Sequence, residues 1–215
     1  MRAGKSIEYG RIYTFAEIDP NDAYFTIHSV TFRTEILKKM NMELQHHTFF
    51  VDCEYILFPV PYINRFVFLE PSVYKYSRGN PEQSVDIVNM VKRYDHHERV
   101  VKRCIEYGVS SNMDVDQKAY YDATLKRILW TQFALSAVYD SNLSRGMERT
   151  KEFYKYLKKT RPDLAKYSLK HFSFLRKAYL VGFNSKLVHA EHAGNMLIQN
   201  NKNKVKRIAV KASLS

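Results

Sequence analysis

The stretch that says most about the fold is VDQKAYYDATLKRILWTQFALSAVYDSN, which covers residues 115–142. Its apolar residues recur at helical spacing and polar residues fill the other positions, so it predicts a long amphipathic helix. The flanking sequence repeats this pattern, and we expect further helices at residues 84–108, 145–160, 162–182 and 185–201. Gly108 is a plausible end for the first of these, and Pro162 suits the first turn of another. The sequence from residue 85 onward therefore predicts an all-α portion.

The sequence before residue 85 has a different texture and indicates short elements. Residues 23–33 (AYFTIHSVTFR) are rich in β-branched and aromatic residues, which is typical of a strand, and EILKKM (35–40) predicts a helical turn or two. Residues 64–77 predict two short strands interrupted by Pro71. The expected fold class is thus an α/β portion followed by an all-α portion, divided into residues 1–84, a basic helical domain at 85–200 and a flexible basic tail at 201–215.

Between the predicted strands lies FFVDCEYILFPVP (49–61), which places two carboxylates, Asp52 and Glu54, inside an apolar run. Because the run is apolar on nearly all sides, its periodicity fits a buried strand and a short buried helix equally well. Asp52 is either a helix-capping residue or a carboxylate at a cleft that accepts a proton from an attacking hydroxyl. For Glu54 we favour an ion pair with a basic residue over a role in orienting the surroundings of Asp52.

The charge is unevenly spread along the 215 residues, whose formal net charge is +12. Residues 1–85 hold nine Lys or Arg and ten Asp or Glu, whereas residues 86–215 hold 25 basic and 12 acidic residues. A positive, tyrosine-rich surface suits anionic lipid head groups, and without a recognised motif we do not expect nucleic-acid binding. Two unrelated cysteines and the lack of a signal-peptide pattern predict a cytoplasmic protein. The positive surface adds an expected peripheral contact with the inner face of the plasma membrane.

Two further groups of residues have both a plain structural role and a chemical one. The stretch YSRGNPEQS (76–84) is either a turn that joins two portions, with Ser84 as a helix cap, or a loop whose arginine and glycine hold a phosphate. The histidines form adjacent pairs, or a pair three residues apart at His189 and His192, with no evident third ligand. The sequence therefore predicts no metal site in this chain.

One long stretch carries a family resemblance. HTFFVDCEYILFPVPYINRFVFLEPSVYKYSRGNPEQSV (47–85) resembles the second half of the catalytic domain of bacterial family 2 glycosyltransferases, which are inverting, nucleotide-sugar-dependent enzymes that build capsules, exopolysaccharides and wall polymers. In that family a stretch like TFYVDVEY, a Tyr-x-Tyr-x-x-Gly element and a QSV follow one another at about this spacing. Stretches like ITMHSLTYRT precede them, matched here by FTIHSVTFRT (25–34). The resemblance covers about residues 8–107.

The resemblance implies a GT-A-like, acceptor-side half and assigns roles to particular residues. Asp52 matches the acidic residue that deprotonates the acceptor hydroxyl at the start of a helix, and Glu54 matches a second acidic position. His28 and Arg33 match the segment that shapes the acceptor side. The segment that closes over the donor diphosphate is matched by Tyr76, Arg78, Gln83 and Ser84.

The chain also departs from the family pattern. These enzymes begin with a nucleotide-binding half that ends in an Asp-x-Asp, whose carboxylates hold Mg²⁺ or Mn²⁺ on the diphosphate. We expect that half to be missing here, because MDVD (113–116) follows the resembling region and lies near a helix start. The expected function is therefore a glycosyltransferase fragment that acts on a nucleotide sugar and a glycan or lipid-linked acceptor, and that is inactive alone. The alternative is a non-enzymatic, basic helical module that binds an acidic partner or a membrane surface.

Overall fold

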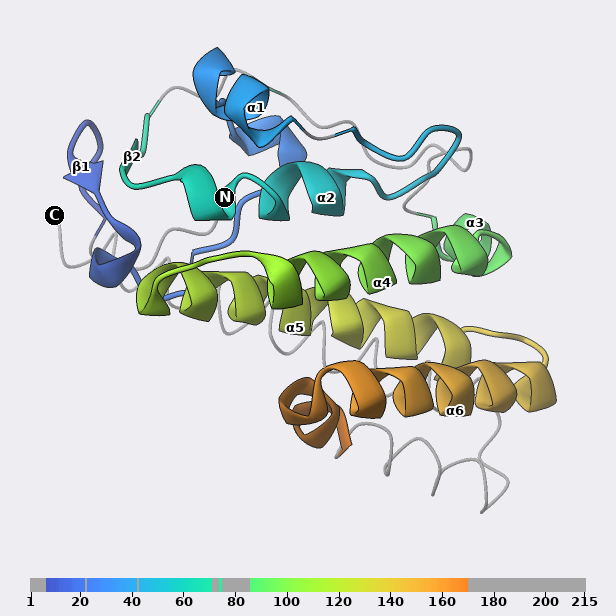
Figure 1. The fold of residues 1–215 in the computed structure, drawn as a ribbon. Coiled ribbons are helices and arrows are strands. Elements are labelled where there is room, and N and C mark those ends of the chain that lie inside the picture. Colours follow the sequence, from blue (N-terminus) through green and yellow to red (C-terminus); the bar gives the residue numbers. More distant parts are fainter. Residues whose placement is uncertain (1–6, 22, 42, 71–73, 75–85, 170–215) are drawn as a thin grey trace, which may run out of the picture.

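Three long helices lie side by side in the computed structural model, which describes residues 7–21, 23–41, 43–70, 74 and 86–169 (Figure 1). They are α4 (Tyr94–Ser110), α5 (Val115–Ala137) and α6 (Leu143–Thr160). α5 contacts both of the others along its length and is buried on most of its circumference. The predicted helical C-terminal portion is therefore confirmed for the described residues, although α5 is less one-sided than the amphipathic helix that we expected.

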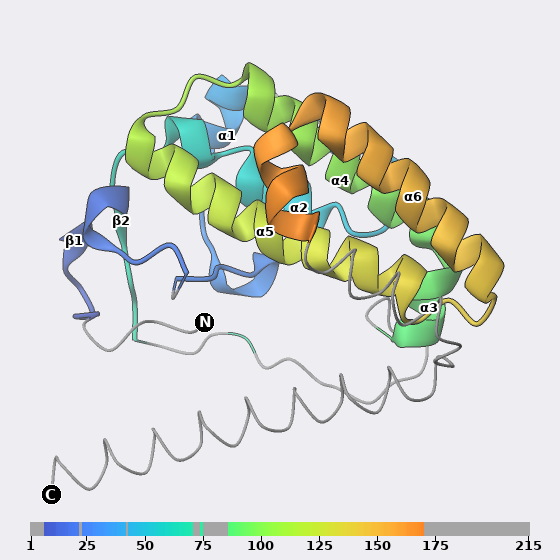
Figure 2. The ribbon, with the colours of Figure 1, turned by 90° about the horizontal axis from the view of Figure 1, so that it is seen from below.

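Local side-chain chemistry sets where these helices begin. The Asp114 side chain accepts hydrogen bonds from the backbone N–H groups of Asp116 and Gln117, and the Asn142 side chain accepts one from Arg145. These bonds satisfy N–H groups that a helix N-terminus leaves without partners. Pro162 occupies the first position of one more helical stretch, residues 162–169. This stretch turns back beside α5, and Arg161 anchors it there through an ion pair of 2.9 Å with Asp122 (Figure 2).

The helix predicted at residues 84–108 is two helices. The first is α3 (Ile87–Lys92), and Arg93, with φ −103° and ψ 25°, separates it from α4. Gly108 does not end α4, which continues to Ser110. A Cβ atom at position 108 would lie 2.6 Å from the ring of Tyr121, so this glycine lets α4 and α5 approach closely.

The N-terminal portion packs on the opposite face of α4 and α5 from α6 (Figure 1). Its only sheet in the described ranges is one antiparallel pair, β1 (Ile12–Tyr13) with β2 (Phe66–Val67), which places Ile12 opposite Val67. The remaining elements are the short 3₁₀ helices η1 (Phe15–Glu17), η2 (Ile27–Ser29) and η3 (Val60–Tyr62) and the helices α1 (Thr34–Met40) and α2 (Asp52–Leu57). Among the described residues there is therefore no GT-A-like sheet.

One strand prediction requires correction, and another is confirmed in part. Residues 23–33 form no strand, because Thr26 and Ser29 satisfy each other's polar groups locally and close the turn of η2. Residues 64–77 contain β2, but the second strand predicted there falls on residues outside the described ranges. The helix predicted at 35–40 is confirmed as α1, and the open choice at residues 49–61 resolves as helix α2 followed by η3.

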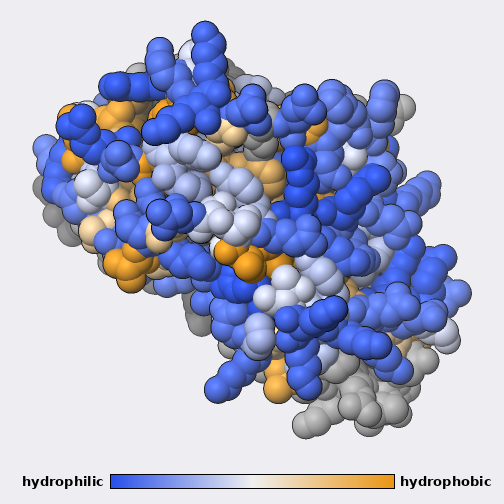
Figure 3. All heavy atoms as spheres, in the orientation of Figure 1, coloured by the Kyte–Doolittle hydropathy of each residue, from blue (hydrophilic) through white to orange (hydrophobic). Residues whose placement is uncertain are grey.

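One hydrophobic core joins the two portions of the chain. Buried aromatic residues from before residue 70, among them Tyr13, Phe15 and Phe68, belong to the same cluster as Val100, Ile105 and Leu125 of α4 and α5. Hydrophilic residues cover most of the surface over α4 and α6 (Figure 3). The change in sequence texture near residue 84 thus separates two kinds of local structure that share one core.

Candidate functional site

Asp52 is the first residue of α2, and its side chain is half-buried. Burial raises the pKa of this carboxyl, and the backbone N–H groups of Asp52 and Cys53 and the charge of His28 offset only part of that rise. Among the described residues no lysine or arginine forms an ion pair with Asp52. A carboxylate that is partly buried without a lysine or arginine partner holds a proton more readily than one in water, which suits a proton acceptor.

The helix that carries Asp52 begins after a constrained loop. His47 and Phe50 both have positive φ, 50° and 69°, a conformation that is costly for residues with side chains. Contacts with the start of α4 hold this loop in place. The guanidinium of Arg93 lies 3.6 Å from the ring centre of Phe49, and the Phe50 ring lies edge-on to His97 at 5.1 Å. The loop therefore fixes where α2 starts and, with it, the position of Asp52.

His28 lies on η2, which packs against α2, and it joins Asp52 to a third part of the chain. Its ring is exposed and stacks on the ring of Tyr74, with centres 4.9 Å apart and planes 10° from parallel. Tyr74 precedes the predicted diphosphate segment by two residues. The structure thus brings His28 close to Asp52, and Tyr74 lies against His28.

Glu54 is turned to a different environment from Asp52, although only two residues separate them. Its side chain is fully buried, and it forms an ion pair of 2.9 Å with Arg103 of α4 and accepts a hydrogen bond from the amide of Gln45. Arg103 also donates to the backbone carbonyl of Glu43 at 2.7 Å. This is the ion pair with a basic residue that we expected, and it gives Glu54 the role of fastening α2 to α4.

The other predicted site residues are placed as follows. Arg33 is exposed and directly precedes the first residue of α1. Tyr76, Arg78, Gln83 and Ser84 lie outside the described residues, so a pocket shared by Asp52 and that segment stays a prediction.

Two residues beside Asp52 were not predicted as site residues. Burial raises the pKa of Tyr24, the nearby charges of Cys53 and Asp52 raise it further, and the charge of Arg127 opposes the rise. The Arg127 guanidinium lies 5.3 Å from the ring centre of Tyr24 and donates to the carbonyl oxygens of Pro20 and Asn21. Tyr24 lies in the quoted stretch 23–33, but Arg127 comes from the middle of α5 and no local motif marks it.

The described residues do not fit the divalent metal that the family resemblance implies for a complete enzyme. Asp52 and Glu54 have different neighbours, because Glu54 is committed to Arg103. Asp114 of MDVD is the N-cap of α5, where backbone N–H groups occupy its side chain. In the part of the chain that the structure describes, no three His, Cys, Asp or Glu residues gather as ligands. We therefore derive no chemical step through a metal held by these residues.

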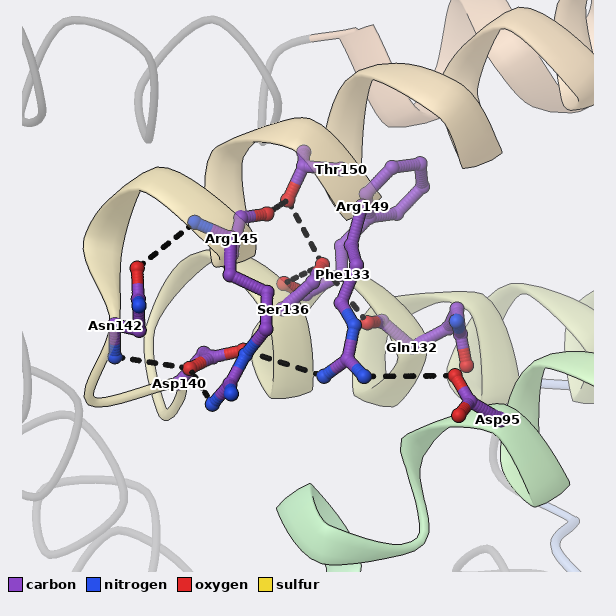
Figure 4. Close-up of polar contacts among 10 residues, drawn as sticks. Asp95, Gln132, Phe133, Ser136, Asp140, Asn142, Arg145, Arg149 and Thr150 are labelled. Carbon is purple, nitrogen blue, oxygen red and sulfur yellow. Dashed lines mark hydrogen bonds and ion pairs between the residues drawn. The ribbon is translucent and has the colours of Figure 1, made fainter.

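A second polar cluster lies at the turn between α5 and α6 (Figure 4). The Asp140 side chain is fully buried and accepts hydrogen bonds from Arg145 at 2.7 and 2.9 Å, from Arg149 at 3.3 Å and from the backbone N–H of Asn142 at 2.9 Å. Burial raises the pKa of Asp140, but these hydrogen bonds and positive charges outweigh it and leave the pKa below its ordinary value. This carboxylate is a structural anchor for the turn.

No family model, curated protein or solved structure matches this chain. The family resemblance consequently rests on the quoted motifs alone. None of the helices in the described ranges is long and apolar enough to cross a lipid bilayer.

Proposed function

We propose that this chain is the acceptor-side part of a family 2 glycosyltransferase and that Asp52 is its general base. The observation that carries the proposal is the placement of Asp52. It is a half-buried carboxylate with no lysine or arginine ion-pair partner among the described residues, it stands at the start of a short helix, and it lies beside His28, which stacks on Tyr74. Asp52, His28 and Tyr74 come from three of the four sequence elements that carry the resemblance.

In the proposed reaction, an acceptor hydroxyl gives its proton to the Asp52 carboxylate while its oxygen attacks the anomeric carbon of a nucleotide sugar. The bond from that carbon to the diphosphate breaks, the nucleoside diphosphate leaves with the bonding electrons, and the configuration at the carbon is inverted. A divalent metal in the nucleotide-binding half would neutralise the charge on the leaving group. Within this chain, Asp52 takes the proton and His28 and Arg33 shape the acceptor side.

The proposal also covers the donor segment and the need for a partner half. Tyr76, Arg78, Gln83 and Ser84 would contact the diphosphate, as the resemblance implies. As the resemblance implies, we assign the metal and the nucleotide to a nucleotide-binding half that is supplied by further sequence or by another chain.

The test is to supply that half in trans. The chain is mixed with the nucleotide-binding half of a family 2 enzyme, Mn²⁺, a panel of uridine diphosphate sugars and octyl glycoside acceptors, and products are identified by mass spectrometry. We expect transfer that falls by about 100-fold or more with Asp52→Asn, since a positioned general base contributes roughly 10²–10⁴-fold. Glu35→Gln, an exposed acidic residue of α1, is the matched control and should leave the rate unchanged.

A binding measurement makes the outcome independent of how well the two halves assemble. In saturation-transfer NMR, the chain alone should bind at least one glycoside of the panel, and His28→Ala should weaken this binding while Asp52→Asn preserves it. If no glycoside binds, or if Asp52→Asn leaves transfer intact, the proposal is wrong.

A further inference from the structure

The C-terminal end of α6 and the helical stretch 162–169 expose a group of cations without carboxylate partners. The four side chains are exposed, and in the described part of the chain none of them forms an ion pair: they are Lys155, Lys158, Lys159 and Lys166. The acidic residues closest in sequence do not neutralise them. Glu148 and Glu152 lie nearer the start of α6, and Asp163 is occupied by Arg161 at 2.7 and 2.9 Å. This end of α6 therefore carries an uncompensated positive charge.

Several other cations of the described structure are paired with carboxylates. Arg103 and Arg145 each bind a fully buried carboxylate, and Lys102 and Lys118 pair with acidic residues one helical turn away. Pairing of this kind leaves little charge available to an external partner. The group at the end of α6 is thus distinct from the mixed-sign surface that covers much of the helical portion.

Exposed apolar side chains accompany these lysines, and the sequence continues in the same way. Leu169 has 43% of its surface exposed, and the Tyr167 ring beside Lys166 is 40% exposed. The next residues, KHFSFLRKAYLVGFNSK (170–186), contain four basic and no acidic residues among phenylalanine, leucine, tyrosine and valine. Over residues 170–215 there are nine basic residues and a single acidic one.

Of the polyanions that could bind, an anionic lipid bilayer suits this combination of exposed lysines and exposed apolar side chains best. A bilayer interface rewards both a cluster of cations and the apolar side chains between them, whereas a phosphodiester backbone rewards only the charge. All four described cations are lysines, whose compact ammonium groups suit a diffuse negative surface better than bidentate recognition of single phosphates. We infer that the end of α6 and residues 162–169 form a contact surface for anionic lipid membranes.

The test measures how the full chain partitions onto vesicles in a sedimentation assay. Vesicles of phosphatidylcholine with about 30% phosphatidylserine should bind it, and pure phosphatidylcholine vesicles should not. The variant Lys155→Gln/Lys158→Gln/Lys159→Gln/Lys166→Gln should weaken partitioning by up to about 600-fold, since each lysine near an anionic surface contributes about fivefold. Because salt screens such attraction, about 0.5 M NaCl should release the wild-type chain.

The matched control removes the same charge elsewhere. Lys38→Gln/Lys39→Gln/Arg65→Gln/Lys92→Gln changes four exposed cations on other elements and should retain most of the partitioning. Circular dichroism of both variants verifies that they fold. Equal losses from the two variants would overturn the inference, because net charge alone would then explain the binding.

Nucleic acid is the competing ligand, and the same variants test it. If wild-type chain binds a labelled mixed-sequence RNA but not phosphatidylserine vesicles, the inference is wrong. The outcome is separate from sugar transfer, because Asp52→Asn should bind vesicles as the wild type does, whatever its effect on transfer.

Discussion

Asp52 and Asp140 are two carboxylates removed from water in different ways. Asp140 is completely enclosed, yet Arg145, Arg149 and a backbone N–H surround it and hold its pKa below the ordinary value. Asp52 is only half-buried, yet burial raises its pKa, because no lysine or arginine among the described residues pairs with it to offset the cost of burying its charge. Paired cations that outweigh the effect of burial distinguish a carboxylate that holds the fold together from one that is available to exchange a proton.

The largest effect should come from removing the enclosed carboxylate. Asp140→Ala leaves two arginines of α6 without their shared partner, and breaking a buried ion pair costs about 3–5 kcal/mol. We expect urea unfolding to show a loss toward the lower end of this range, since Arg145 is half exposed and can regain water. Asp95→Ala is the control. The Asp95 side chain is 81% exposed and its contact with Arg149 is long, at 3.5 Å, so its loss should cost less than about 1 kcal/mol. Equal losses would contradict the structural role of Asp140.

The next largest effect should appear in the pH dependence of stability. It concerns His97, a buried titratable group that, like Asp52, has no ion-pair partner among the described residues. His97 is buried between α4 and α5 with Gln132 as its hydrogen-bond partner at 2.5 Å, and burial lowers its pKa from 6.5 to about 4. Between these two pKa values, His97 is protonated in the unfolded chain and neutral in the folded chain. Stability should therefore be complete above pH 6.5 and fall by up to about 3 kcal/mol as the pH drops to 4.

Variants assign that pH dependence to His97. Urea unfolding of His97→Gln between pH 7 and 4 should show a shallower slope than the wild type, whatever its stability at pH 7. His46→Gln, which changes an exposed histidine, should keep the wild-type slope. A slope that is the same in all three proteins would mean that other groups cause the acid sensitivity.

A smaller loss is expected at Glu54, which has a countercharge that is itself partly exposed. Glu54→Ala should cost about 2 kcal/mol, because Arg103 loses its buried partner but is 36% exposed and can be rehydrated. Thermal unfolding measures this loss. Glu43→Ala keeps the backbone carbonyl that Arg103 contacts and removes only an exposed side chain, so it should be neutral. A neutral Glu54→Ala would show that the ion pair does not fasten α2 to α4.

The smallest effect on stability is expected at Asp52. Its raised pKa means that the folded state disfavours the charged form, so Asp52→Asn should be at least as stable as the wild type at pH 7. The difference should shrink as the pH falls and the wild-type carboxyl takes up its proton. Calorimetry at pH 7 and pH 4 measures both. A clear destabilisation at pH 7 would indicate that the charge of Asp52 serves the fold.

The sequence predicted the elements whose information is local. The position of α5, the turn of helix at α1 and the ion pair of Glu54 follow from spacing, capping and the cost of burying a charge. Residues 23–33 misled because a stretch rich in β-branched and aromatic residues does not reveal that Thr26 and Ser29 bond to each other and close a turn.

Other parts of the two sites depend on contacts that no local pattern encodes. Arg127 reaches carbonyl oxygens more than 100 residues earlier in the chain, and only the packing of α5 against the N-terminal portion brings them together. Arg145 and Arg149 lie one turn apart on α6, but their convergence on Asp140 requires the turn between α5 and α6 to fold back on itself. Capping by Asn142 was the available local signal for that turn.

Gly146 sits where α6 crosses α5, and a Cβ atom there would overlap the carbonyl oxygen of Ser136. Even a single methyl group would force the two helices apart, break the 2.8 Å bond between the Ser136 and Thr150 hydroxyls and draw Arg145 away from Asp140. We therefore expect that no other residue type fits at position 146 unless the two helices shift apart. A homologous chain with a larger residue here would have to cross its helices at a greater separation and find a different way to shield its buried acid.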